Sequence, residues 1–253
     1  MLAWMDTAPG TLTILGCDGS YPGPGGAASG YLVEQGGTTL WLDAGPGTFA
    51  RLQEVVDPRT VDAIVLSHEH PDHWSDLESF AVWLMNSGTR VPVQVYAAPG
   101  IERRAYFGET RLLDWHETGP GARMKVGGLV LTFDRTDHGP PTMAVRVDRD
   151  GAGSDPATAL VYSADTGAGW SVASLGQGIG TFLCEATYTL DQEGHFRHLS
   201  GRQAGDMAAT AGVGRLVVTH RWPPVPSGAV LAEADDAFGK PVHQAAPGRV
   251  FEW

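Results

Sequence analysis

The 253-residue sequence predicts an α/β fold, organised as one domain over residues 1–253, in which short strands alternate with amphipathic helices. Runs of β-branched and aromatic residues end in polar or glycine-rich turns, the pattern of short strands. Hydrophobic residues make up 42% and charged residues 18%, which suffices for a core and excludes a disordered chain. The 34 glycines and 17 prolines argue against long helices.

The first half of the chain is expected to open with strands at 11–17, 30–34 and 38–43, which form an antiparallel meander. Residues 46–56 predict a helix because their apolar side chains share one face. A strand at 62–66 leads directly into a histidine cluster, and an amphipathic helix follows at 75–86. The other elements expected here are strands at 93–97, 129–135, 142–147 and 159–163, a short helix near 100–107, and a polar loop at 148–156.

The second half continues with a strand at 181–185. Ser200 and Gln203 form a capping-box pattern that begins a helix running to about residue 211. A buried strand is expected at 216–219, a helix capped by Ser227 ends at Gly239, and an edge strand covers 249–253. Residues 64–68 and 216–220 resemble each other, because each is an apolar strand that ends in a histidine, which suggests two similar halves that meet at one site.

The chain is acidic, with a net charge of −12 and a pI near 5.0. Such a surface repels long polyanions, so neither a large nucleic acid nor an anionic membrane is an expected partner, whereas a small anion could bind a locally positive site. No apolar run approaches the ~20 residues of a membrane helix, and the N-terminus does not resemble a signal peptide. The two cysteines form no CxxC pair, and we expect buried thiols and a cytoplasmic location.

A dense cluster of histidines follows the strand at 62–66. His68, His70 and His73 lie within six residues together with Asp72, a density that structural roles rarely explain. Residues 68 and 70 of an extended segment point to the same side, so both rings can reach one ion. Pro71 then turns the chain, so that Asp72 and His73 face a second position. Imidazole and carboxylate ligands without cysteine suit Zn²⁺, Mn²⁺ or Fe²⁺.

Further ligand candidates lie after other predicted strands, namely His138, Asp165 and His220. With the HxHxDH segment, these residues resemble the motif set of the metallo-β-lactamase superfamily, and Asp43 resembles its early aspartate, which orients ligands. The resemblance implies a four-layer αββα sandwich with two divalent metal ions, most simply zinc, at one edge of the sheets. It implies that His68, His70 and His138 hold one ion, that Asp72, His73 and His220 hold the other, and that Asp165 bridges them.

The segments Cys184–Thr187 and His198–Ser200 resemble the ribonuclease Z branch of that superfamily. The resemblance implies that Glu185 orients His198, which protonates the departing alkoxide, and that Asp72 also belongs to the catalytic set; His195 is the rival for the acid role. It further implies that Ser29 and Gly30 meet the oxygens of a phosphate. Homodimers are usual in this branch, so the resemblance also implies a homodimer.

One feature separates the sequence from ribonuclease Z. Only 26 residues lie between His138 and Asp165, and they contain no basic, glycine-rich arm that could grip transfer RNA. The sequence without this arm resembles a group of atypical bacterial cyclic-nucleotide phosphodiesterases more closely than it resembles ribonuclease Z. The leading hypothesis is therefore hydrolysis of a small phosphodiester, foremost a 3′,5′-cyclic nucleotide, by a metal-bridging hydroxide and a histidine acid. The alternatives are a lactonase or thioesterase-type metallohydrolase, a ribonuclease Z-like RNA endonuclease, and a metal-stabilised binding protein.

Overall fold

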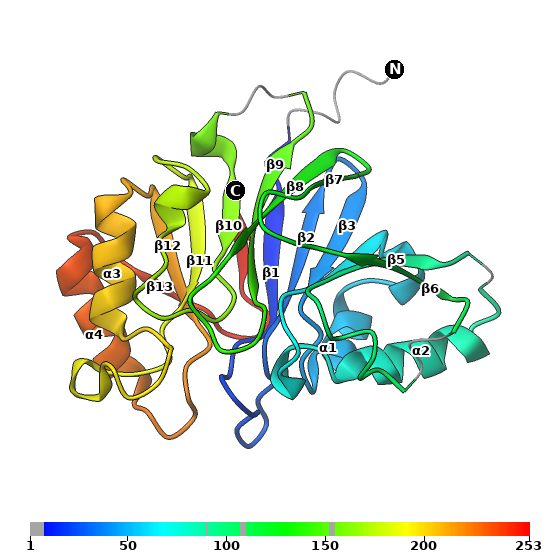
Figure 1. The fold of residues 1–253 in the computed structure, drawn as a ribbon, viewed down its shortest axis with the longest axis horizontal. Coiled ribbons are helices and arrows are strands. Elements are labelled where there is room, and N and C mark those ends of the chain that lie inside the picture. Colours follow the sequence, from blue (N-terminus) through cyan, green and yellow to red (C-terminus); the bar gives the residue numbers. More distant parts are fainter. Residues whose placement is uncertain (1–7, 90, 107–109, 152–154) are drawn as a thin grey trace.

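The computed structural model describes residues 8–89, 91–106, 110–151 and 155–253, and in them two seven-stranded sheets pack face to face (Figure 1). The first sheet has the order β14 (Val250–Glu252), β1 (Thr11–Gly16), β2 (Gly30–Gln35), β3 (Thr38–Leu42), β4 (Ala63–Leu66), β5 (Val93–Ala97), β6 (Leu113–Glu117). The second has the order β13 (His243–Gln244), β12 (Arg215–Thr219), β11 (Thr181–Glu185), β10 (Leu160–Tyr162), β9 (Met143–Arg149), β8 (Leu129–Arg135), β7 (Arg123–Val126).

Helices cover the outer faces of both sheets, which gives four layers (Figure 1). Helices α1 (Thr48–Val55) and α2 (Asp76–Asn86) lie on the first sheet, and α3 (Gly201–Thr210) and α4 (Ser227–Phe238) lie on the second. The alternation of side chains along β11 shows how the layers are filled. Leu183 belongs to the core between the sheets, whereas Phe182 and Cys184 belong to the core beneath α3 and α4. The expected αββα sandwich is therefore confirmed.

Each sheet contains four consecutive parallel strands, β3 to β6 in one and β10 to β13 in the other. The carboxyl ends of parallel strands in one sheet lie at the same edge, where loops can carry functional groups. His68 follows β4 and His220 follows β12. The loops that carry them meet, because the ring of His73, in the loop after β4, lies 5.1 Å from the ring of His220. The repeated strand-histidine pattern thus brings both halves to one edge.

Most predicted elements are confirmed, including the opening meander, the capping box at Ser200 and the edge strand at the C-terminal end. Three predictions about elements were wrong or incomplete. The helix expected near 100–107 is instead a run of bends and turns in its described part, 100–106, where the N–H groups of Arg104 and Ala105 both bond to the carbonyl of Ile101. Ser227 is the first helical residue of α4, and Pro226 occupies the cap. Strands β6, β7 and β13 were missed.

Other expectations from composition are confirmed more simply. Cys17 and Cys184 are free thiols, of which Cys184 is buried as expected and Cys17 only partly buried, and burial raises the pKa of Cys17 to about 12. Among the described residues, no helix has both the length and the apolar character needed to traverse a lipid bilayer. Residues 152–154 of the expected polar loop lie outside the described part of the chain.

Candidate active site

The candidate site lies where strands of both sheets end. Asp43 follows β3, His68 follows β4, Asp165 follows β10 and His220 follows β12, while Glu185 is the last residue of β11. Asp43, Ala164 and His220 have φ angles of 54°, 52° and 53°. A non-glycine residue in this left-handed region costs about 1–2 kcal/mol, and such strain concentrates at functional sites. At these three positions the left-handed backbone conformation turns the chain where it leaves a strand.

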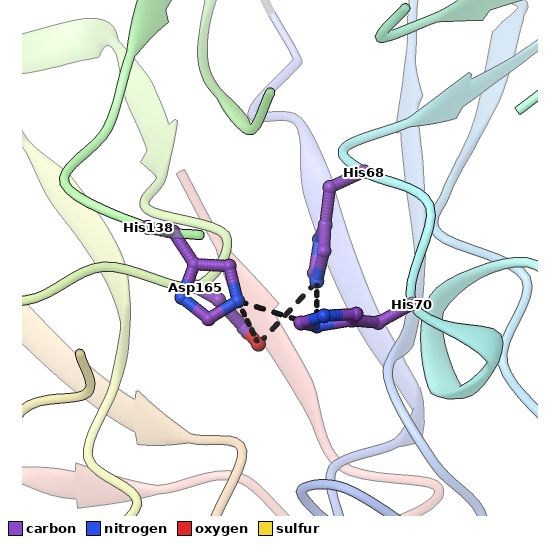
Figure 2. Close-up of side chains that lie close together, drawn as sticks. All are labelled: His68, His70, His138 and Asp165. Carbon is purple, nitrogen blue, oxygen red and sulfur yellow. Dashed lines mark hydrogen bonds and ion pairs between the residues drawn. The ribbon is translucent and has the colours of Figure 1, made fainter. Parts of the chain in front are cut away.

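The first cluster consists of His68, His70, His138 and Asp165 (Figure 2). The Nδ1 of His70 lies 3.0 Å from the Nε2 of His68 and 3.2 Å from the Nε2 of His138. The Oδ2 of Asp165 is 3.5 Å and 3.8 Å from the same two Nε2 atoms. Figure 2 shows the four side chains pointing toward one another, His68 and His70 from one loop and His138 and Asp165 from two others, so their ligand atoms surround a common point.

A second cluster, of Asp72, His73 and His220, adjoins the first. The Oδ2 of Asp72 lies 3.4 Å from the Nε2 of His73 and 3.2 Å from that of His220. The other carboxylate oxygen of Asp165, Oδ1, lies 3.3 Å from both of these Nε2 atoms. Asp165 therefore directs one oxygen to each cluster, which is the geometry of a bridging carboxylate. Asp72 and His73 lie in the short 3₁₀ turn Pro71–His73, which directs them away from the preceding HxH pair.

Four of the histidines are oriented by acceptors on their outer ring nitrogen. The Nδ1 of His138 donates to the carbonyl of Arg197 (3.0 Å), and that of His73 donates to Oδ2 of Asp43 (2.7 Å). The Nδ1 atoms of His68 and His220 lie against hydroxyl oxygens, of Ser67 and Thr187 respectively. With its proton on Nδ1, each ring presents the lone pair of Nε2 to the cluster, which is how metal-binding histidines are usually held.

Asp43 is the centre of this support. It is fully buried, and its Oδ2 accepts hydrogen bonds from the hydroxyls of Ser67 (2.8 Å) and Tyr162 (2.7 Å) in addition to the His73 ring, while Oδ1 accepts from the Ser67 N–H. These donors fix the carboxylate in one orientation. Asp43 thus connects the His73 ring to Ser67 and Tyr162 by hydrogen bonds.

The electrostatics of the clusters are those of a site that needs a cation. Burial raises the pKa of Asp165, but the neighbouring His220, His73 and His68 outweigh burial and hold it well below the ordinary range. Burial lowers the pKa of His68 and of His70. For His73, the carboxylates of Asp165, Asp72 and Asp43 outweigh the effect of burial and raise its pKa.

The donor set fits divalent metal ions. Asp165 Oδ1 is buried without a hydrogen-bond partner, and an unpaired buried carboxylate oxygen is costly unless a positive charge meets it. Imidazole nitrogens that face each other at 3.0 Å also require a proton or a cation between them. Nitrogen and carboxylate ligands without cysteine suit Zn²⁺, Mn²⁺ or Fe²⁺. The histidine and aspartate clusters are therefore able to bind metal.

A histidine–glutamate pair borders the clusters. The Nδ1 of His198 donates to Oε1 of Glu185 at 2.9 Å, and the His198 ring stacks on that of His220 at 5.4 Å. Burial lowers the pKa of His198, but the carboxylates of Glu185 and Asp165 outweigh burial and raise it to about 9. His195, the alternative acid, is exposed to solvent. The structure thus pairs Glu185 with His198.

Ser29 and Gly30, which were expected to meet the oxygens of a phosphate, are both buried in the structure. Ser29 is fully buried, and its carbonyl accepts from the N–H of Gly45. A Cβ on Gly30 would lie 2.5 Å from the Thr48 side chain, so this residue is small because the first turn of α1 packs on it. Both residues therefore support the chain beneath the site.

Sequence reasoning missed the residues that orient the ligands, namely Thr187, Ser67 and Tyr162. Thr187 has the most contacts. Its Oγ1 lies 2.9 Å from His220 Nδ1 and 2.7 Å from Glu185 Oε2, so one hydroxyl connects a candidate ligand with the histidine–glutamate pair. Thr187 stands within the segment Cys184–Thr187 that pointed to Glu185, so its position was visible although its contacts were not.

The four-layer sandwich and the converging histidine and aspartate side chains define a metal-dependent hydrolase. Residues 38–221 match the family model described as the beta-lactamase superfamily domain. The chain therefore belongs to the metallo-β-lactamase superfamily.

Three relatives show which members of the superfamily the chain resembles. An uncharacterized protein of Mycobacterium tuberculosis is 34% identical, over 95% of this chain and 91% of its own length. The probable metallo-hydrolase YhfI of Bacillus subtilis is 27% identical over 95% of this chain and 99% of its own, and its crystal structure superimposes with a TM-score of 0.86, covering 97% of this chain and 99% of that one at 25% identity. Ribonuclease Z of Mycobacterium marinum is 29% identical over 86% of this chain and 88% of its own.

Proposed function

We propose that the chain is a metal-dependent phosphodiesterase that hydrolyses small phosphodiesters, with a 3′,5′-cyclic nucleotide as the leading substrate. The observation that carries this proposal is the Glu185–His198 pair beside the two clusters, in which Glu185 is fully buried and His198 remains partly accessible. An alcohol is a poor leaving group, and a positioned acid accelerates its departure by ~10²–10⁴-fold. Hydrolysis of an activated ester has less need of such a group.

In this proposal each residue has a definite task. His68, His70 and His138 would hold one divalent ion, Asp72, His73 and His220 a second, and Asp165 would bridge them. Bound ions of this kind supply Lewis acidity and lower the pKa of water toward neutrality. His198 donates a proton to the leaving oxygen, and Glu185 keeps the acid form of His198 populated at neutral pH.

The relatives and the charge support a small phosphodiester rather than RNA. The ribonuclease Z relative acts on RNA by its name, and RNA is itself a phosphodiester. The net charge of −12, however, disfavours a long polyanion, and a small anion needs only local positive charge. We further propose that the site binds zinc and that the chain acts in the cytoplasm.

The test compares kcat/KM of metal-loaded protein for cyclic AMP, bis(p-nitrophenyl) phosphate, an acyl-lactone and a precursor transfer RNA. We expect both small phosphodiesters to be hydrolysed, and activity to disappear with a chelator and to return when metal is added back. His198→Ala is expected to retain bound metal and to lose ~10²-fold or more in phosphodiester turnover. Preferred hydrolysis of the lactone or of the RNA would contradict the proposal.

A further inference from the structure

Three aromatic side chains lie together on the side of the site that carries His198 and His220. The Tyr188 ring is 6.1 Å from that of Phe196, 6.0 Å from that of Trp222 and 5.8 Å from that of His198. We call Tyr188, Phe196 and Trp222 the aromatic cluster. Phe196 is two residues before His198, and Trp222 is two residues after His220, so both sheet-end loops contribute to it.

The inner part of this cluster is held rigidly. Tyr188 and Trp222 are half-buried and pack on the core beneath α3 and α4. The N–H of Tyr188 donates to the carbonyl of Leu199, and the N–H of Trp222 donates to the carbonyl of Thr187. The two segments that carry the candidate ligand His220 and the acid His198 are therefore hydrogen-bonded to the backbone of the aromatic residues, and their relative positions are set together.

The outer part of the cluster is open. Phe196 is 68% exposed, although a phenylalanine gains free energy by burial. A single exposed apolar residue is ordinary, but this one adjoins the Tyr188 ring, which in turn contacts Trp222, and stands two residues from the proposed acid. An aromatic surface beside a reaction centre is suited to a planar group of the substrate.

We propose that the aromatic cluster binds the nucleobase of the substrate. The inference rests on the proposed function and makes it more specific. A general acid must lie within hydrogen-bond distance of the oxygen that leaves, so the leaving alcohol lies beside His198. The Tyr188 ring is 5.8 Å from that of His198, so the remaining atoms of the alcohol can reach Tyr188 and, beside it, Phe196. Every base has an aromatic face, so stacking on such rings recognises a nucleoside with little preference among bases.

The test compares the binding of AMP with that of ribose 5-phosphate, which has the phosphate and the sugar but no base. Calorimetry on metal-loaded protein measures both dissociation constants. We expect AMP to bind about tenfold more tightly than ribose 5-phosphate, the size of effect that one stacked base gives. Phe196→Ala is expected to remove most of this difference, and Tyr188→Leu to do the same while keeping an apolar side chain. Leu190→Ala, an exposed residue of the same loop, is the matched control and should keep the ratio.

Two results would overturn the inference. Equal affinity of the wild-type protein for AMP and for ribose 5-phosphate would mean that no base is bound, and an unchanged ratio in Phe196→Ala would mean that the base lies elsewhere. Turnover of bis(p-nitrophenyl) phosphate is measured in parallel. If that turnover is present while the affinities are equal, the aromatic inference fails and the phosphodiesterase proposal stands. If no phosphodiester is hydrolysed, the proposed function itself fails.

Discussion

Thr187 offers the sharpest test of how the site is organised. Its hydroxyl lies within 3.4 Å of four atoms, of which the closest are Glu185 Oε2 (2.7 Å) and His220 Nδ1 (2.9 Å). A hydroxyl has one proton, so it donates to Glu185 and accepts from the His220 ring. Thr187→Val keeps the shape of the side chain and removes both bonds.

The expected loss of zinc affinity in Thr187→Val follows from which polar groups lose their hydrogen-bond partner. Glu185 Oε2 retains the N–H of Leu199 at 3.2 Å, whereas the Nδ1–H of His220 is left without an acceptor among the residues that the structure describes. A buried polar group without a partner costs about 1–3 kcal/mol. Loss of the group that orients a metal-binding histidine weakens metal affinity or activity by about 10–100-fold. We expect Thr187→Val to bind Zn²⁺ more weakly by a factor in that range.

The assay is a zinc titration against a chromophoric chelator, carried out well below the thermal midpoint so that unfolding does not contribute. Thr181→Val is the matched control, because Thr181 is buried in β11, the strand that Thr187 follows, at the end away from the site. The control should bind zinc as the wild-type protein does. Equal zinc affinity and equal kcat/KM for the two variants would refute the argument that Thr187 orients His220.

Three further predictions test other parts of the structure. Asp165→Asn is expected to lower the metal content of purified protein, because a neutral amide cannot balance two cations; elemental analysis measures this, and an unchanged content would speak against the bridging position. Glu185→Gln removes the charge that raises the pKa of His198 to about 9, compared with an ordinary 6.5. Because the acid form is lost as pH rises, the alkaline limb of kcat/KM should move to lower pH by up to about two units, and a limb that stays in place would exclude His198 as the acid. Gly205→Ala in α3 places a Cβ 2.6 Å from the carbonyl of Ala234 in α4, so the free energy of unfolding should fall by about 1–3 kcal/mol in a urea titration; an unchanged midpoint would show that the helices separate freely.

The strands and the capping box could be predicted from sequence because their signals are local. Apolar runs between turns, and Ser200 followed by Gln203, depend only on neighbours along the chain. The helix predicted near 100–107 does not form in the described part, 100–106, because tertiary structure there outweighs local propensity: Arg104 forms a bidentate ion pair with Glu69, and the segment consists of bends and turns. Strands β6 and β7 were missed because they are half-exposed, so their apolar pattern is weak.

For the site, the sequence by itself determined which side chains are the candidate ligands and catalytic groups. It shows three histidines and an aspartate within six residues, and a histidine or an aspartate after each of several later strands. Only the tertiary structure decided their geometry. Contacts between segments far apart in the chain direct one oxygen of Asp165 to each cluster and place Thr187 between His220 and Glu185. Such contacts also bury Ser29. Distances of this kind arise when two sheets pack, and no local pattern of residues encodes them.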